Sequence, residues 1–188
     1  MRDVVLVSSL FLALACGGAH KPTAHAARPL TPEQLKAFDE GVDFVATLEG
    51  LEGRWRADWD RDLELRVSSA DRIALVTVRT LLTDTDPEQR VTYRLMAQID
   101  RDLMGDEKSK EVELPVSGDD PGFTSVQDNL GRIPDQHFIA YIRREPTGTR
   151  WHLSPASDPV VTETQGKISE LARIPNQSSS ERVIVHNH

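Results

Sequence analysis

The spacing of apolar residues changes once along the chain, and the change separates a predicted helix from a predicted β-domain. Thr31, Pro32 and Gln34 supply an N-cap, a favoured first helical residue and a capping box. Apolar residues then recur at helical spacing, at Leu35, Phe38, Val42, Val45 and Leu48. The opposite face is mainly acidic, with Glu33, Asp39, Glu40 and Asp43. The pattern predicts one amphipathic helix over residues 31–49 that docks its apolar face on a core.

The period of the pattern becomes two from Ile73 onward, which is typical of β-strands. Residues 55–71 before it fit a strand or a short helix, and we favour the helix. Residues 161–174 predict a short C-terminal helix that ends before Pro175. The predicted strands cover residues 73–78, 91–100, 112–116 and 138–142, with a fifth around Trp151 and Leu153. The sequence therefore predicts a mostly β-domain, with its barrel at about residues 71–157.

The connection over residues 117–136 is long for a compact domain, and such loops are usually functional or disordered. It carries more apolar side chains than a solvated loop needs. Two interpretations stay open: the loop covers an end of the barrel, or it presents these side chains to a partner. Tryptophans raise the same question, because they fill cores and are also enriched at interfaces. The candidate partner-binding residues are Phe123, Val126, Leu130, Trp55 and Trp59.

The first 17 residues predict export and lipid attachment. Arg2 precedes an apolar run over residues 4–15, which is too short to span a bilayer and suits a secretory signal. The run ends in Leu-Ala-Leu-Ala-Cys16-Gly17, which resembles the bacterial lipobox. That resemblance implies removal of residues 1–15 and a lipid such as palmitate on Cys16. Gly17 rather than Asp favours the outer membrane by the enterobacterial sorting rule. The alternative is an ordinary signal peptide with an incidental cysteine.

Composition limits what the exported part does. The chain has 22 basic and 30 acidic residues and a net charge of −8, which disfavours binding to nucleic acid. Cys16 is the only cysteine, so the domain has no disulfide. Residues 16–30 read as the acylated cysteine with a flexible spacer, and residues 175–188 read as a disordered tail. Residues 31–174 remain, which is enough for a single globular domain.

The order of strands resembles a known family. Ala70-Asp71 leads into the strand at 73–78, a second strand ends in Asp102-Leu103-Met104-Gly105, and Phe138–Ile142 precedes a strand that contains Trp151. This order resembles the small OB-type barrels of netrin and tissue-inhibitor-of-metalloproteinase modules. The resemblance implies an OB-like barrel of five or six strands. It does not imply protease inhibition, because the inhibitors use an N-terminal disulfide that this chain lacks. An immunoglobulin-like β-sandwich is the alternative fold.

No pattern in the sequence amounts to a catalytic or metal site. Ser154, His152 and Asp158 can be grouped as a triad, but no nucleophile elbow or glycine-rich oxyanion loop surrounds the serine. His186 and His188 form a pair near the C-terminus without further rigid ligands. We therefore expect no catalytic residue, no metal site and no cofactor.

These expectations favour a non-enzymatic accessory or adaptor lipoprotein of the bacterial cell envelope. It would be held in the outer membrane by its lipid, face the periplasm or the cell surface, and bind another envelope protein. The alternatives are a periplasmic module for a small ligand or a metal, and an inhibitor of an envelope hydrolase. An enzyme that uses His152 or Ser154 ranks last, and the sequence does not indicate an oligomeric state.

Overall fold

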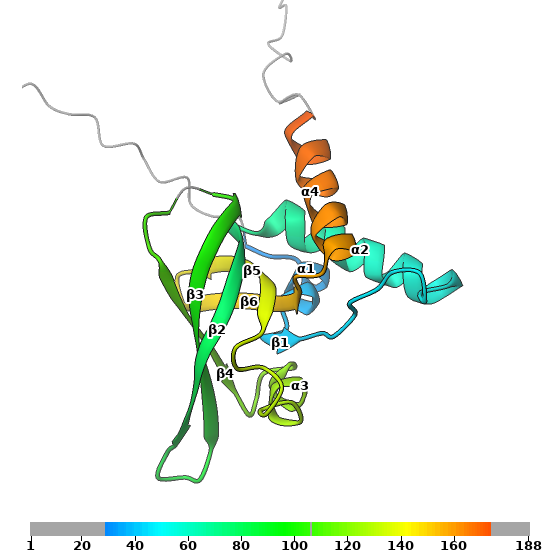
Figure 1. The fold of residues 1–188 in the computed structure, drawn as a ribbon. Coiled ribbons are helices and arrows are strands. Elements are labelled where there is room, and N and C mark those ends of the chain that lie inside the picture. The colour runs from blue at the N-terminus through cyan, green and yellow to red at the C-terminus, as the bar shows by residue number, and fades with distance from the viewer. Residues whose placement is uncertain (1–28, 106, 174–188) are drawn as a thin grey trace, which may run out of the picture.

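The computed structural model describes residues 29–105 and 107–173 (Figure 1). The predicted signal peptide, Cys16, most of the spacer and the tail from Pro175 lie outside these residues. Within them, no helix is both long and apolar enough to cross a membrane. In chain order the elements are α1 (Pro32–Ala37), β1 (Gly41–Val42), α2 (Gly53–Ser69), β2 (Arg72–Thr85), β3 (Val91–Met104), β4 (Glu111–Ser117), α3 (Phe123–Gln127), β5 (His137–Glu145), β6 (Gly148–Pro155) and α4 (Asp158–Arg173).

All six strands belong to one sheet, in the order β1-β6-β5-β2-β3-β4. Consecutive strands β2, β3 and β4 pair antiparallel, β5 returns to the other side of β2, and β6 pairs with β5. The sheet curls into a half-barrel, and the Trp151 Nε1–H of β6 donates to the Pro115 carbonyl of β4 at 2.7 Å. The predicted mostly β, barrel-like fold is therefore confirmed. An immunoglobulin-like sandwich needs two packed sheets, and the described strands form one.

The curl follows from irregular pairing between the two longest strands. Register shifts interrupt the β2–β3 ladder after Ile73, after Leu75 and after Val78. Each irregularity bends the strands and increases their twist. Both strands have 14 residues, so the hairpin extends well beyond the predicted strand at 73–78 and projects from the rest of the sheet (Figure 1). The sequence pattern missed the extension because the residues near the hairpin tip are exposed on both faces.

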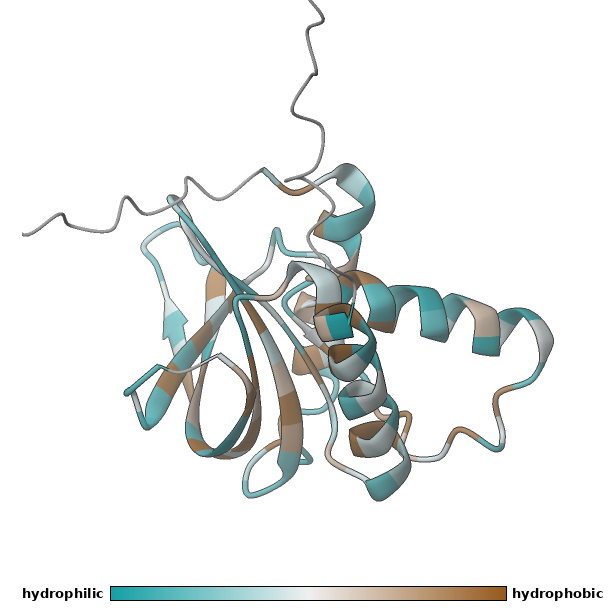
Figure 2. Ribbon diagram, turned by 90° about the horizontal axis from the view of Figure 1, so that it is seen from above, coloured by the Kyte–Doolittle hydropathy of each residue, from teal (hydrophilic) through white to brown (hydrophobic). Residues whose placement is uncertain are grey.

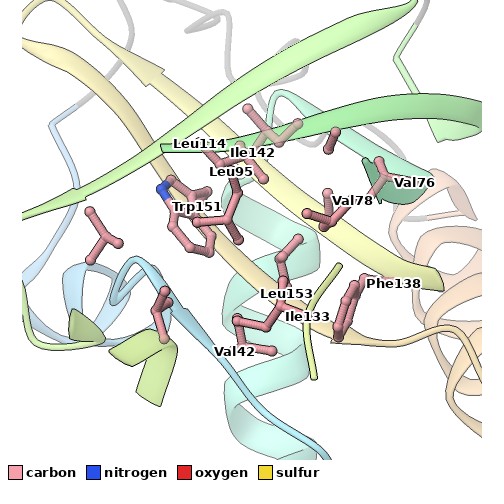
Figure 3. Close-up of a cluster of buried hydrophobic side chains, with 14 of the residues drawn as sticks. Val42, Val76, Val78, Leu95, Leu114, Ile133, Phe138, Ile142, Trp151 and Leu153 are labelled. Carbon is pink, nitrogen blue, oxygen red and sulfur yellow. The ribbon is translucent and has the colours of Figure 1, made fainter. Parts of the chain in front are cut away.

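Two apolar cores lie on the two faces of the curled sheet. The inner core fills the half-barrel, and Trp151, Leu95 and Leu153 are fully buried in it (Figure 3). The outer core lies under the helices, where α1, α2 and α4 cover β2 and β5 (Figure 2). Its centre contains Leu63 and Val67 of α2 with Ile139 and Tyr141 of β5. β5 is thus covered on both faces, which explains its unbroken apolar run.

The predicted helix over residues 31–49 is wrong after its first two turns. The capping box at Thr31 forms as expected, but α1 ends at Ala37. Glu40 takes a positive φ of 55°, and Gly41 begins β1, which pairs parallel with β6. The two apolar positions beside this break serve different cores, because Phe38 lies in the outer core and Val42 in the inner one. One helical face could not reach both.

The other two helix predictions are confirmed. Residues 55–71, where the sequence left a choice, lie mostly in α2, and residues 161–174 lie mostly in α4. The ambiguity in α2 has a physical cause. Few of its side chains are buried, namely Leu63, Arg66, Val67 and Ser69, and all of these lie in its C-terminal half.

Candidate functional site

A polar cluster lies where β1 meets β6. Asp39 and Asp43 flank β1, while His152 and Ser154 lie on the neighbouring strand β6. His152 Nδ1 lies 2.7 Å from Asp39 Oδ1, and His152 Nε2 lies 3.0 Å from Asp43 Oδ2. The Ser154 hydroxyl donates to the same Asp43 oxygen at 2.7 Å. The imidazole therefore bridges the two ends of β1, and Ser154 shares one of its carboxylate partners.

The hydrogen bonds define the charge of the cluster. Burial by itself raises the pKa of Asp39 and Asp43, but the hydrogen bond and positive charge of His152 outweigh it and lower the pKa of both carboxyls. A carboxylate only accepts hydrogen bonds, so both contacts are hydrogen bonds when each ring nitrogen of His152 carries a proton. In that form an imidazolium lies between two carboxylates. His152 is only 3% exposed.

Helix α2 and strand β5 extend the cluster into the outer core. Arg66 of α2 places Nη1 3.7 Å from Asp43 Oδ2 and donates from Nε to the Ala37 carbonyl at 2.9 Å. Its guanidinium carbon lies 5.9 Å from the ring centre of Tyr141. The Thr164 hydroxyl donates to the backbone of α4, so the Tyr141 hydroxyl donates to Thr164 at 2.8 Å. Burial raises the pKa of Tyr141 to about 12, so the phenol stays neutral.

The arrangement does not match the triad that the sequence allows on paper. His152 and Ser154 do share a face of β6, but Asp43 lies between them and accepts from both. A serine nucleophile needs a neighbouring base to take its proton. Here the Ser154 hydroxyl donates to Asp43 rather than to the imidazole, and Ser154 is 1% exposed. Asp158 begins α4, and no described hydrogen bond joins it to either residue. The geometry links β1 to β6 and does not form the triad of Ser154, His152 and Asp158.

Glu40 forms a second buried polar feature next to this cluster. Its side chain is 4% exposed, and Oε1 accepts from Arg150 Nη1 at 2.9 Å. Its other oxygen, Oε2, is buried and has no hydrogen-bond partner among the described residues. Burial raises the pKa of Glu40 to about 7, although the hydrogen bond and charge of Arg150 oppose the rise. A carboxyl that loses its charge near neutral pH therefore lies at the start of β1.

The candidate partner-binding residues separate into two groups. In the loop over residues 117–136, Val126 is fully buried, and Phe123 stacks on Tyr93 with ring centres 5.2 Å apart. Leu130 is partly buried against the same inner core. The loop thus covers an end of the half-barrel, which was the first of its two interpretations. Val126 contributes nothing to the surface, and Phe123 and Leu130 present only part of theirs.

The two tryptophans of α2 differ from each other. Trp55 is 76% exposed and is the most exposed of the large apolar side chains that the structure describes. Trp59 packs against the outer core, with the Arg56 guanidinium carbon 5.5 Å from its ring centre. Among the five candidates, only Trp55 presents most of its side chain to solvent.

Neither a group of metal ligands nor similarity to a known protein identifies the function of this site. In the described part of the chain, no group of three or more His, Cys, Asp or Glu side chains could hold a metal ion. No known protein-family model and no curated protein matches this chain.

Sequence reasoning missed the two members of the polar cluster that flank β1. Asp39 and Asp43 read as the solvated face of a helix, and no local signal links them to β6. The only usable signal is that His152 and Ser154 alternate on one strand and so share a face.

Proposed function

We propose that this chain is a non-enzymatic lipoprotein of the bacterial cell envelope, which binds another envelope protein through the exposed end of α2. The observation that supports it is the position of Trp55. It lies in the first turn of α2, at the end of the helix that is farthest from the sheet (Figure 2). By contrast, His152 and Ser154, the two residues that an enzyme would use, are buried.

An exposed tryptophan with polar neighbours suits a protein interface. Such hot spots combine one large amphipathic anchor with a rim of polar groups. Beside Trp55 in the helix, Arg54 pairs with Asp58 at 3.3 Å. Opposite charges balance along this face, so it suits a neutral protein surface better than an anionic lipid headgroup.

The proposed tether brings this end of α2 near its partner. A lipid such as palmitate on Cys16 holds the chain in the outer membrane, with the domain facing the periplasm or the cell surface. Thirteen residues, 17–29, separate Cys16 from Leu30, which packs against the outer core. The lipid would therefore keep the domain close to the membrane surface.

We also propose that the half-barrel is an OB-type barrel. Its support is the order of pairing: three strands in a meander, a return of β5 to β2, and β6 beside β5. The hydrogen bond between Trp151 and Pro115 brings β6 next to β4, as closure of such a barrel requires. The short helix α3 lies between β4 and β5. Fold by itself does not identify the partner, because one fold serves many functions.

The test of partner binding uses site-specific photo-crosslinking in cells. A photoreactive residue replaces Trp55 in the membrane-anchored chain, and the matched control carries it at Arg61, whose side chain is 63% exposed on the same helix. We expect one discrete adduct at position 55 and none at position 61, with loss of the adduct in a Cys16→Ser background. Equal adducts at both positions, or none at position 55, would contradict the proposal.

Acylation is tested separately. Cells that are fed a labelled palmitate analogue should label the native chain and not the Cys16→Ser variant. The native chain should also fractionate with membranes, and the variant should not. If the two behave alike, the lipid anchor is wrong even where a crosslink at position 55 survives.

A further inference from the structure

A groove of about 410 Å³ lies beside the start of β5. It is formed by three segments that are far apart in sequence: Phe44, which follows β1 by two residues, the loop before β5 with the start of β5, and Pro155 at the end of β6. Its volume falls within the usual range for small-molecule sites. The lining side chains that the argument uses are Phe44, Arg132, Gln136, His137, Phe138 and Pro155.

Arg132 is the main charged group of the groove, and its charge is not neutralised. Its guanidinium carbon lies 4.2 Å above the ring centre of Phe44, and Nη1 donates to the side chain of Asn129 at 3.0 Å. It forms no ion pair with any other described residue. Stacking on Phe44 holds the planar guanidinium and leaves its remaining N–H donors for a ligand, and such a planar donor is well suited to a carboxylate.

His137 adds a second polar group with a defined orientation. The Thr77 hydroxyl donates to Asp100 at 2.7 Å, so its contact with His137 Nδ1 at 3.0 Å requires Nδ1 to be the donor. Nε2 has no hydrogen-bond partner within the described residues. The imidazole is 73% exposed. One ring nitrogen is thus committed to the sheet. In the neutral ring Nε2 carries a lone pair, so it accepts a hydrogen bond and does not donate one to a carboxylate.

Part of the groove wall is apolar, and the charged side chain that lines it is the cation Arg132. Phe44 and Phe138 meet edge to face, with ring centres 6.3 Å apart, and Pro155 continues this surface. No acidic residue lines the groove, although the chain carries a net charge of −8. The nearest acidic neighbour in sequence, Asp135, is 79% exposed and lies 3.9 Å from Arg79. A ligand with an anionic end and a flat apolar body complements both features.

A second groove of similar volume differs from the first in its acidic lining and in the pairing of its cation. It has about 440 Å³ and lies near the tip of the β2–β3 hairpin, where Asp86 and Asp119 line it together with Arg90. Asp86 Oδ2 already accepts from Arg90 Nε at 2.7 Å. Its one cation is therefore neutralised, and the groove provides a matched control.

We propose that the groove around Arg132 binds a small aromatic carboxylate. The carboxylate would accept from Arg132, and the ring would lie against Phe44 and Pro155. This inference does not depend on partner binding through Trp55, and either can fail without the other.

The test is isothermal titration calorimetry of the full chain carrying Cys16→Ser, with 2-naphthoate as the probe and neutral 2-naphthamide as its isostere. We expect saturable binding of the acid, with at least tenfold weaker binding of the amide. Arg132→Gln should weaken binding of the acid by about tenfold or more, because the ion pair is lost. Arg132→Lys should bind with intermediate affinity, since it keeps the charge and loses the planar donor.

Arg90→Gln, in the other groove, should bind 2-naphthoate as the parent chain does. Equal affinities for acid and amide, unchanged binding in Arg132→Gln, or absence of saturation at millimolar probe would each overturn the proposal. Arg132 is exposed, so its variants should keep the urea midpoint of the parent chain. This check separates loss of a ligand contact from loss of the fold.

Discussion

His152 and Asp39 are 113 residues apart in the chain, yet His152 Nδ1 lies 2.7 Å from Asp39 Oδ1. The contact joins the last strand of the half-barrel to the segment before β1. Because the imidazole also reaches Asp43, a single side chain holds both ends of a two-residue strand. The attachment of β1 therefore depends more on charge and hydrogen bonding than on the length of its ladder.

Replacement of His152 should test this dependence. His152→Leu fills much of the same volume but leaves two partly buried carboxylates without their shared hydrogen-bond donor. We expect a loss of about 3 kcal/mol in the free energy of unfolding, measured by urea denaturation at neutral pH. Ser154→Ala, which removes a single hydrogen bond, should cost about 1 kcal/mol. If the two losses are equal, the imidazole is not what holds β1.

Acid should weaken the same attachment. His152 lowers the pKa of Asp43 below its ordinary value, so the unfolded chain takes up a proton at higher pH than the folded one does. The stabilisation is complete above the ordinary pKa of 3.8, and it is lost as the pH falls through the lower folded pKa. Asp43→Asn should be less stable than the native chain at pH 7, and this difference should shrink below about pH 4. Parallel stability profiles in urea would contradict this account.

Glu40 should give the opposite pH response. Burial raises its folded pKa to about 7 from 4.5, so the folded chain binds this proton more tightly than the unfolded chain does. Its contribution is therefore fully present below pH 4.5 and is lost as the pH rises through about 7, with a slope of at most about 1.4 kcal/mol per pH unit. Glu40→Gln cannot titrate, so it should gain stability relative to the native chain between pH 5 and pH 8. A constant difference across this range would show that Glu40 does not titrate there.

The strands β3, β4, β5 and β6 and the first half of β2 were predictable because they have a local signature. The alternation from Val91 to Ile99 and the unbroken apolar run from Phe138 to Ile142 both reflect which faces of the sheet are covered. The OB-like expectation was met at the level of a curled, mostly β half-barrel. The position of a strand and its buried face depend on residues that are close in sequence, so the pattern of apolar and polar side chains predicts them.

The interruption of the predicted helix and the polar cluster were not predictable in this way. Phe38, Val42 and Leu48 have helical spacing by coincidence, since they end in two different cores. The partners of His152 and Ser154 come from a segment 109 to 113 residues earlier. No period or motif reports such a distance, and the nearest sequence candidate for the third residue, Asp158, lies outside the cluster.

Gly122 provides the sharpest test of how the loop before α3 packs on β1. Its N–H donates to the Asp39 carbonyl at 2.6 Å, so the two backbones lie in close contact. A Cβ at this position would lie 2.5 Å from that carbonyl oxygen and closer still to the backbone of Gly41, and no flexible side chain can move aside. Gly122→Ala should therefore cost more than about 2 kcal/mol in urea denaturation, since overpacking displaces backbone.

Gly118 lies in the same loop and serves as the control, because a Cβ there would meet nothing within 4 Å. Gly118→Ala should change the stability by less than about 0.5 kcal/mol. Amide hydrogen exchange gives a local measurement on the same pair. Gly122→Ala should speed exchange at Glu40 and Asp43, whose N–H groups donate to the Trp151 and Leu153 carbonyls of β6. If both variants exchange as the native chain does, the loop does not clamp β1 against β6.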